Sequence, residues 1–439
     1  MDSNDKHNIN LRPVRVSHFN WLRGFFGGAI MTAIFTVADI VLNQPDGWKL
    51  GAVATFVCLA IALRFSKALC GYQFTAWIIA AVTAAMMYPA NILHVGGFDM
   101  RNKWLLLIIV QLVMFGMGTQ MSLKDFSGVA KSPRGVLVGI ICHFSVMPLV
   151  GLALIKTFHF DPEIAAGIIL IGSCSSGLAS NVMAYIAKSN LALSVTVTAV
   201  TTMIAPIMTP LWMKLLAGQL IEVKFFNMMM EIIKIVLVPI AAALLHDYLK
   251  HASVSGRKFI FGLAAFGAAW LLFLAAGGWG FIKANVPENT AITISIFGFM
   301  LAAVVAGVLF NESSKRVAQL ESWMPRFSMF GIVYFTLVTT AAGRDNLLKI
   351  GLLLFFAAAI HNVAGYIFGY WLSRASGLDK NSARSVAFEV GLQNGSMASG
   401  VANAMGMLGT MGLAAAIFSP WMNVTGSVLA NYWGKRPAK

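Results

Sequence analysis

Long apolar stretches, separated by short polar segments, follow one another along almost the whole chain. Each is long enough to cross a bilayer as a helix of about 20 residues. We predict fourteen transmembrane helices, at 23–43, 49–64, 71–95, 104–122, 135–157, 163–187, 191–217, 226–248, 259–282, 289–311, 327–343, 350–373, 385–405 and 410–434. The alternating pattern of a transmembrane β-barrel would dilute this hydropathy, so an all-α polytopic membrane protein is predicted.

Composition excludes the soluble and disordered classes. Of the 439 residues, 58% are hydrophobic and only 11% are charged. Soluble domains carry roughly 25% charged residues, and disordered chains combine low hydrophobicity with high charge. The four cysteines lie in or beside apolar stretches, with no spacing typical of a zinc site or disulfide framework.

The surplus of basic residues reports topology. There are 32 Lys and Arg against 17 Asp and Glu. With the N-terminus inside, 22 basic residues fall on inner segments and nine on outer ones, and Lys234 lies within a span. This asymmetry follows the positive-inside rule. It predicts fourteen crossings with both termini cytoplasmic, in what we expect to be a bacterial inner membrane, and it requires no nucleic-acid partner. The polar segment 1–22 lacks a cleavage pattern and is predicted to be a cytoplasmic tail.

Acidic residues are rare within the predicted spans. Asp39 lies near the outer end of its helix, and Glu231 has Lys234 three residues on, which predicts a local pair. Glu389 differs, because Gln393 and Asn394 follow it in a stretch rich in glycine and serine. A carboxylate, amides and glycines at mid-membrane are typical of a broken helix that lines a polar cavity.

A second stretch, IGSCSSGLASN, interrupts the span at 163–187 in the same way. In the next helix Ser194 and Thr198 are four residues apart and share a face. The two interrupted helices lie about 210 residues apart, one in each half of the chain. Such a pair indicates a secondary transporter built of inverted repeats. Carboxylate, hydroxyl and amide oxygens suit a hard cation such as Na⁺.

Several separated motifs resemble the bile acid:sodium symporter (BASS) family, prokaryotic type. They are SGLASNVMAYIAKSNLALSVTVTAV, AGQLIEV with the VLVP after it, HNVAGYIFGYWLSRASGLD, RSVAFEVGLQN and WMNVTGSVLANYW, in the family's order. The resemblance covers roughly 71–250 and 325–434.

The resemblance implies ten core helices in two inverted five-helix repeats, with panel and core domains. The crossed discontinuous helices would be 163–187 and 385–405. The implied division is a tail at 1–22, an additional N-terminal hairpin at 23–70, the first repeat at 71–218, the start of the second at 219–250, an inserted hairpin at 251–324, the rest of the second repeat at 325–434 and a cytoplasmic tail at 435–439.

Two Na⁺ sites are also implied, with Na⁺ as the coupling ion. The first would use Ser180, Asn181, Ser194, Thr198 and Glu389. The second would use Glu389 again, with the main-chain carbonyls of Val390 and Leu392, Gln393 and the residue at position 143.

Three positions depart from the family pattern. The motif CHFSVMP has His143 where the family has glutamine, and an imidazole is a poor Na⁺ ligand that can take a proton. The second site could then be weakened, hold a water, be proton-linked, or stay intact beside the histidine. Leu178 and Met422 make the implied substrate cavity more apolar. Asn394, Asn423 and Leu178 are the candidate substrate contacts.

The predicted function is Na⁺-coupled symport of an organic anion by alternating access, without enzymatic activity. The anion would be of the bile acid, pantoate or 2-oxo acid class. A proton-linked carrier or a cation/proton antiporter is the alternative, although an antiporter should carry paired carboxylates where only Glu389 is available. Motifs of intramembrane enzymes are missing. The sequence leaves open a passive channel or receptor, and it predicts no oligomeric state.

Overall fold

The computed structural model describes residues 17–42, 46–66, 69, 72–317 and 319–436. Most of the predicted N-terminal tail, and residues 437–439 of the C-terminal one, lie outside the described residues. The chain forms two compact units, Met1–Met87 and Tyr88–Lys439.

The first unit is helical, with α1 (Ser17–Val41), α2 (Gly47–Arg64) and α3 (Gln73–Met87). Thr55 on α2 donates a hydrogen bond to the Thr32 hydroxyl on α1 at 3.0 Å. Gly51 lies so close to Thr36 that a Cβ atom there would meet its hydroxyl at 2.4 Å. Small and hydroxyl side chains thus let α1 and α2 approach closely, as is common between membrane helices.

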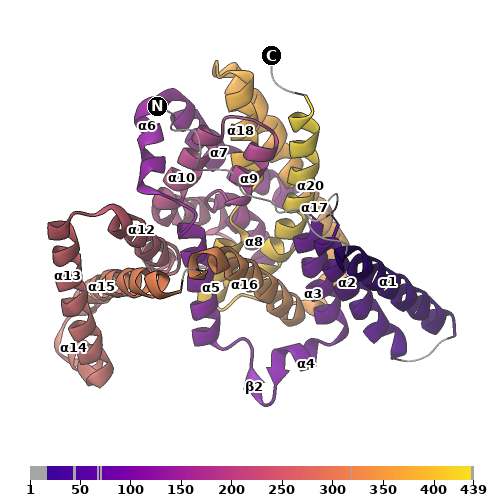
Figure 1. The fold of residues 1–439 in the computed structure, drawn as a ribbon, viewed down its shortest axis with the longest axis horizontal. Coiled ribbons are helices and arrows are strands. Elements are labelled where there is room, and N and C mark those ends of the chain that lie inside the picture. Colours follow the sequence, from indigo (N-terminus) through magenta and orange to yellow (C-terminus); the bar gives the residue numbers. More distant parts are fainter. Residues whose placement is uncertain (1–16, 43–45, 67–68, 70–71, 318, 437–439) are drawn as a thin grey trace. The chain divides into compact units, whose positions relative to one another are not determined.

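The second unit is also almost wholly helical (Figure 1). Its elements are α4 (Pro89–Leu93), β1 (His94–Val95), β2 (Phe98–Asp99), α5 (Lys103–Gly118), η2 (Leu123–Ser127), α6 (Gly128–Lys131), α7 (Pro133–Thr157), α8 (Pro162–Ser173), α9 (Ala179–Ile186), α10 (Leu191–Trp212), η3 (Met213–Ala217), α11 (Phe225–Ile232), η4 (Ile233–Leu237), α12 (Val238–His251), α13 (Val254–Phe273), η5 (Leu274–Gly278), α14 (Trp279–Asn285), α15 (Glu288–Arg316), α16 (Leu320–Ala342), α17 (Arg344–Ala375), α18 (Lys380–Gly391), α19 (Gly395–Ala404) and α20 (Gly412–Gly434). The predicted all-α class is confirmed.

Nine helices of the described residues are long and apolar enough to cross a membrane, or ten if α5 and the bent segment after it count as one span. Two other predicted spans are the interrupted ones, which form the pairs α8/α9 and α18/α19. Serine and glycine residues end these helices mid-span, so neither half reaches spanning length. The last two predicted spans overlap α3, which has 15 residues, and α16, which begins before the predicted span and carries Glu321 and Arg326 in its first turns.

The predicted helix 71–95 is not continuous. Helix α3 ends at Met87, and Pro89 begins the short α4. Proline has no N–H for the helix ladder and disfavours the helical conformation in the residue before it. A two-residue turn at Gly96 and Gly97, with φ of 57° and 82°, then joins β1 to β2. These positive φ values suit glycine in a tight hairpin.

The core of the second unit surrounds α18. Every residue from Ser382 to Gly391 is buried, although the segment holds arginine, glutamate and serines. Large apolar side chains instead stay exposed on other helices, with Leu272 on α13 at 70% and Leu352 on α17 at 72%. This inside-out pattern is expected where outer helices face lipid and the interior holds a polar site.

Candidate functional site

The breaks in the two interrupted helices meet inside the protein. Ser176 and Gln393 form an isolated antiparallel bridge. The Gly177 N–H donates to the Leu392 carbonyl at 3.0 Å, and the Asn394 N–H donates to the Ser175 carbonyl at 2.9 Å. Backbone groups freed by the breaks therefore find partners in each other, as they must away from water.

Gly177 is required at this crossing for steric reasons. A Cβ atom there would lie 2.7 Å from the Gln393 carbonyl oxygen. Across the crossing, Asn394 immediately precedes α19, and its side-chain oxygen accepts a hydrogen bond from the Met397 N–H at 3.0 Å. This is a normal N-cap, and it fixes where the second half of the broken helix starts.

Glu389 lies one turn before the break and is fully buried. Thr198 on α10 donates to one carboxylate oxygen at 2.8 Å, and Ser194 donates to the other. Within the described part of the chain, no lysine, arginine or histidine forms an ion pair with it. An ionised carboxylate buried without a countercharge is costly, so the site calls for a cation or a proton.

Two residues of α9 complete the cluster. The side-chain oxygen of Asn181 lies 2.9 Å from the Ser194 hydroxyl and 3.2 Å from the Thr198 hydroxyl. Ser180 lies 3.3 Å from the Thr198 hydroxyl. Ser194 and Thr198 each have one proton to donate but several oxygens in reach, so the cluster holds surplus oxygen lone pairs. The structure thus brings together all five residues predicted for the first Na⁺ site, and their chemistry fits a hard cation.

The residues predicted for the second site also lie at the crossing, but their main-chain carbonyls already accept hydrogen bonds. The Val390 carbonyl accepts from the Gln393 amide at 2.7 Å. The Leu392 carbonyl accepts from the Gly177 N–H at 3.0 Å and the Ser176 hydroxyl at 3.3 Å. Among the described residues, the buried Gln393 side-chain oxygen has no hydrogen-bond partner. Gln393 thus supplies an oxygen with no bound donor among those residues, and the Val390 carbonyl, which accepts one hydrogen bond, keeps a second lone pair.

His143 on α7 lies between the two broken helices. Its Nδ1 is 2.9 Å from the Glu389 carbonyl and its Nε2 is 2.8 Å from the Cys174 carbonyl. The ring thus contacts the main chain of Glu389, not its carboxylate. A neutral imidazole carries one N–H, so it can donate to only one of these two carbonyls. His143 therefore offers a donor to one of these carbonyls, where a cation site needs acceptors.

The three candidate substrate contacts lie at or near the crossing. Leu178 immediately precedes α9, and Asn394 precedes α19 with its amide 3.4 Å from the Ser175 hydroxyl. Asn423 on α20 donates to the Ser419 carbonyl within its own helix at 2.8 Å. Asn394 therefore contacts the opposite helix break, whereas the Asn423 amide makes its hydrogen bond within its own helix.

Sequence reasoning missed the role of Asn362 on α17. Its amide donates to the Gly391 carbonyl at 2.8 Å, and its oxygen accepts from the Thr425 hydroxyl at 2.6 Å. Gly391 ends α18, so Asn362 supplies the partner that this carbonyl lacks. A signal was present, because His361 and Asn362 form a polar pair in the middle of an apolar span.

An all-helical membrane protein whose broken helices meet at a buried carboxylate has the architecture typical of a secondary transporter. The family model described as "Sodium Bile acid symporter family" matches residues 107–285. The chain is 30% identical, over 84% of its length and 93% of the relative's, to the uncharacterized sodium-dependent transporter YocS of Bacillus subtilis.

Two further relatives match with lower identity. The probable sodium/metabolite cotransporter BASS1 of Arabidopsis thaliana is 28% identical over 83% of this chain and 74% of its own length. The human ileal sodium/bile acid cotransporter is 27% identical over 66% of each chain. The chain belongs to the sodium bile acid symporter family, a family of sodium-dependent transporters, which confirms the resemblance seen in its motifs.

Proposed function

We propose that the protein is a Na⁺-coupled symporter of an organic anion that works by alternating access. The observation that carries this proposal is the buried Glu389 carboxylate, surrounded by hydroxyl and amide oxygens at the crossing of two broken helices. The sodium-dependent relatives support Na⁺ as the cation that balances its charge.

The first Na⁺ would be bound by side chains from three helices at once. Asn181 and Ser180 belong to α9, Ser194 and Thr198 to α10, and Glu389 to α18. A cation held by all three would order the crossing and stabilise the cavity that accepts the anion. Because coupling between two sites is reciprocal, Na⁺ should raise the affinity for the anion, and the anion should raise that for Na⁺ by the same factor.

The second Na⁺ site, with Glu389, Val390, Leu392, Gln393 and His143, would be the weaker of the two. Its main-chain carbonyls already accept hydrogen bonds, and the His143 ring directs an N–H donor, not a ligand oxygen, at the crossing. Under this proposal one Na⁺ accompanies each anion, and the free oxygen of Gln393 contacts a water or the edge of the first site.

The anion would be bile-acid-like or a small carboxylate. This class is supported by the names of two relatives, a bile acid cotransporter and a metabolite cotransporter. The helices α9 and α19 both begin at the crossing, where their positive ends attract a carboxylate. Asn394, Asn423 and Leu178 would then contact the anion, and the apolar Leu178 favours one with a hydrophobic body.

The predicted domain division and topology remain part of the proposal. The segments 23–70 and 251–324 would be hairpins added to a ten-helix core, and both termini would be cytoplasmic. Labelling of a single cysteine placed at Lys439 in intact cells tests this orientation. Reaction with a membrane-impermeant maleimide added outside intact cells would contradict it.

Uptake of ²²Na⁺ into proteoliposomes, driven by a gradient of each candidate anion, tests the transport proposal. Glu389→Gln should abolish anion-dependent ²²Na⁺ uptake, whereas Glu312→Gln, which changes a half-buried acid paired with Lys315 away from the crossing, should not. Coupled uptake that persists in Glu389→Gln would contradict the role of Glu389. Exchange of H⁺ for Na⁺ with no anion requirement would favour the antiporter instead.

A further inference from the structure

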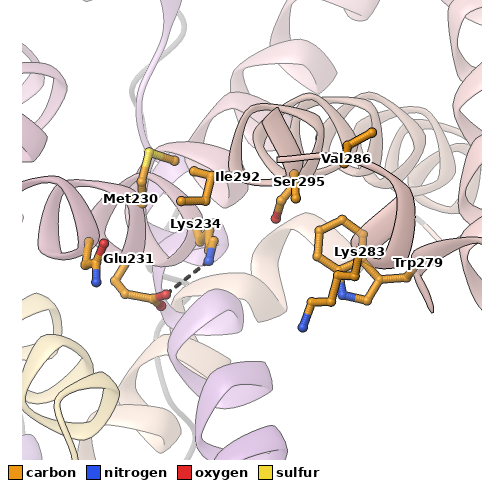
Figure 2. A pocket seen from close by; sticks show the side chains of 10 residues that line it. Met230, Glu231, Lys234, Trp279, Lys283, Val286, Ile292 and Ser295 are labelled. Carbon is orange, nitrogen blue, oxygen red and sulfur yellow. Dashed lines mark hydrogen bonds and ion pairs between the residues drawn. The ribbon is translucent and has the colours of Figure 1, made fainter. Parts of the chain in front are cut away.

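A cleft of about 520 Å³ lies between α11–η4 and the helices α14 and α15 (Figure 2). Its polar lining comes from Asn227, Glu231, Lys234, Lys283 and Ser295, with Trp279 beside Lys283. None of these residues belongs to the crossing of the broken helices. The function proposed above therefore leaves the cleft without a role.

The cleft carries more positive than negative charge. Lys234 lies 3.0 Å from the carboxylate of Glu231. The Lys283 ammonium lies 5.6 Å from the centre of the Trp279 ring, and no carboxylate of the described residues is within 4.0 Å of it. The cleft lining therefore holds two lysines and one glutamate, and this net positive charge favours an anionic group between the two ammonium groups.

An apolar groove of about 630 Å³ continues along the same helices. Its wall on α15 includes Ile296, Met300 and Val304, spaced four residues apart on one helix face. Ile292, one turn earlier on that face, lines the cleft. On the opposite side Lys234 of the cleft is followed by Leu237 and Ala241 of the groove. From Ile292 to Val304 the α15 face runs about 18 Å, at 1.5 Å per residue.

We propose that the cleft and the groove together, here called the lipid seam, bind a glycerophospholipid with an anionic headgroup. The phosphate would lie between Lys234 and Lys283, with Ser295 as a further donor, and one acyl chain would occupy the groove. Basic pockets between membrane helices recognise anionic headgroups, and tryptophan favours the headgroup level. The almost wholly apolar groove has no partner for a soluble anion, which is why a lipid fits better than free phosphate or a small carboxylate.

The test uses the full chain, purified in detergent and given equimolar phosphatidylglycerol and phosphatidylcholine. Native mass spectrometry should show retention of one phosphatidylglycerol in preference to phosphatidylcholine. Lys283→Gln should weaken this retention about fivefold, the effect expected for one basic side chain near an anionic lipid, and adding Lys234→Gln should weaken it further. Lys349→Gln removes an exposed lysine outside the cleft and should have no effect.

A second pair of variants tests the acyl chain. Ala241 is exposed and lines the groove, so Ala241→Trp should displace both lipids. Ala265→Trp, at an exposed position of α13 outside the groove, is the matched control. Equal retention of the two lipids by the unmodified chain, or unchanged retention in the lysine variants, would overturn the proposal. So would thermal stabilisation by glycerol 3-phosphate as large as that by phosphatidylglycerol, because a soluble anion would then suffice.

Discussion

Thr198 on α10 donates a hydrogen bond of 2.8 Å to the carboxylate of Glu389 on α18, across 191 residues of sequence. The contact joins a continuous helix to the first half of a broken one. Both side chains are buried, so neither has water as an alternative partner. An ion bound at this site would therefore affect the positions of both helices.

We expect Thr198→Val to raise the Na⁺ concentration for half-maximal uptake at least about tenfold. The change keeps the side-chain shape but removes one ligand oxygen and a hydrogen bond to a charged group, worth roughly 1.5–3 kcal/mol. Thr201→Val is the matched control, because the Thr201 hydroxyl is buried on the same helix but bonds only the Thr198 carbonyl, at 3.1 Å. An unchanged Na⁺ dependence in Thr198→Val, measured by ²²Na⁺ uptake, would place the ion elsewhere.

We expect His143→Gln to raise the number of Na⁺ ions per anion from one toward two. Glutamine supplies an acceptor oxygen where the neutral imidazole donates its one N–H to the carbonyl of Glu389 or to that of Cys174. The ratio is measured by comparing the fluxes of ²²Na⁺ and of the labelled anion into the same proteoliposomes.

His143→Leu, which offers no ligand, is the control and should keep a ratio of one. A ratio of two in the unmodified chain, with the same uptake across neutral pH, would show that His143 leaves the second site intact. Uptake that depends on pH only while His143 is present would instead support the proton-linked alternative.

Gly177→Ala should disrupt the crossing. Its Cβ atom would lie 2.7 Å from the Gln393 carbonyl, a contact that forces the two helix breaks apart. We expect a melting temperature lowered by several degrees in detergent and loss of uptake. Gly262→Ala is the control, because nothing lies within 4 Å of that position on α13 and alanine favours a helix there. Equal melting temperatures for the two variants would show that the crossing tolerates the extra atom.

The sequence alone predicts the broken helices but only part of what holds them. Serine and glycine within apolar runs indicate where α8 and α18 end, and Glu389 stands out because acids are rare in membrane spans. Pro89 itself indicated the interruption of the predicted helix 71–95, but the long apolar run led to the prediction of one continuous helix.

Partners that lie far apart in sequence leave no comparable pattern. Hydropathy shows that Asn362 is a polar residue in a span, but not that it faces Gly391. Likewise, His143 is visible as a departure from a family pattern, while its position between two carbonyls depends on three helices. The lipid seam depends on how α15 lies along α12, which the composition of either helix does not specify.

Asn362→Ala should impair both stability and Na⁺ binding. It leaves the buried Gly391 carbonyl without its side-chain donor, a loss of about 1–3 kcal/mol of stability, and frees the end of α18 two residues after Glu389. We therefore expect a lower melting temperature together with a weaker apparent Na⁺ affinity. Thr425→Val removes the contact to the Asn362 oxygen and one to the Tyr366 hydroxyl, but it keeps the bond from Asn362 to Gly391, so it should change Na⁺ affinity much less. A purely structural role predicts a lower melting temperature with unchanged Na⁺ affinity, and that result would exclude Asn362 as a residue that positions the ion site.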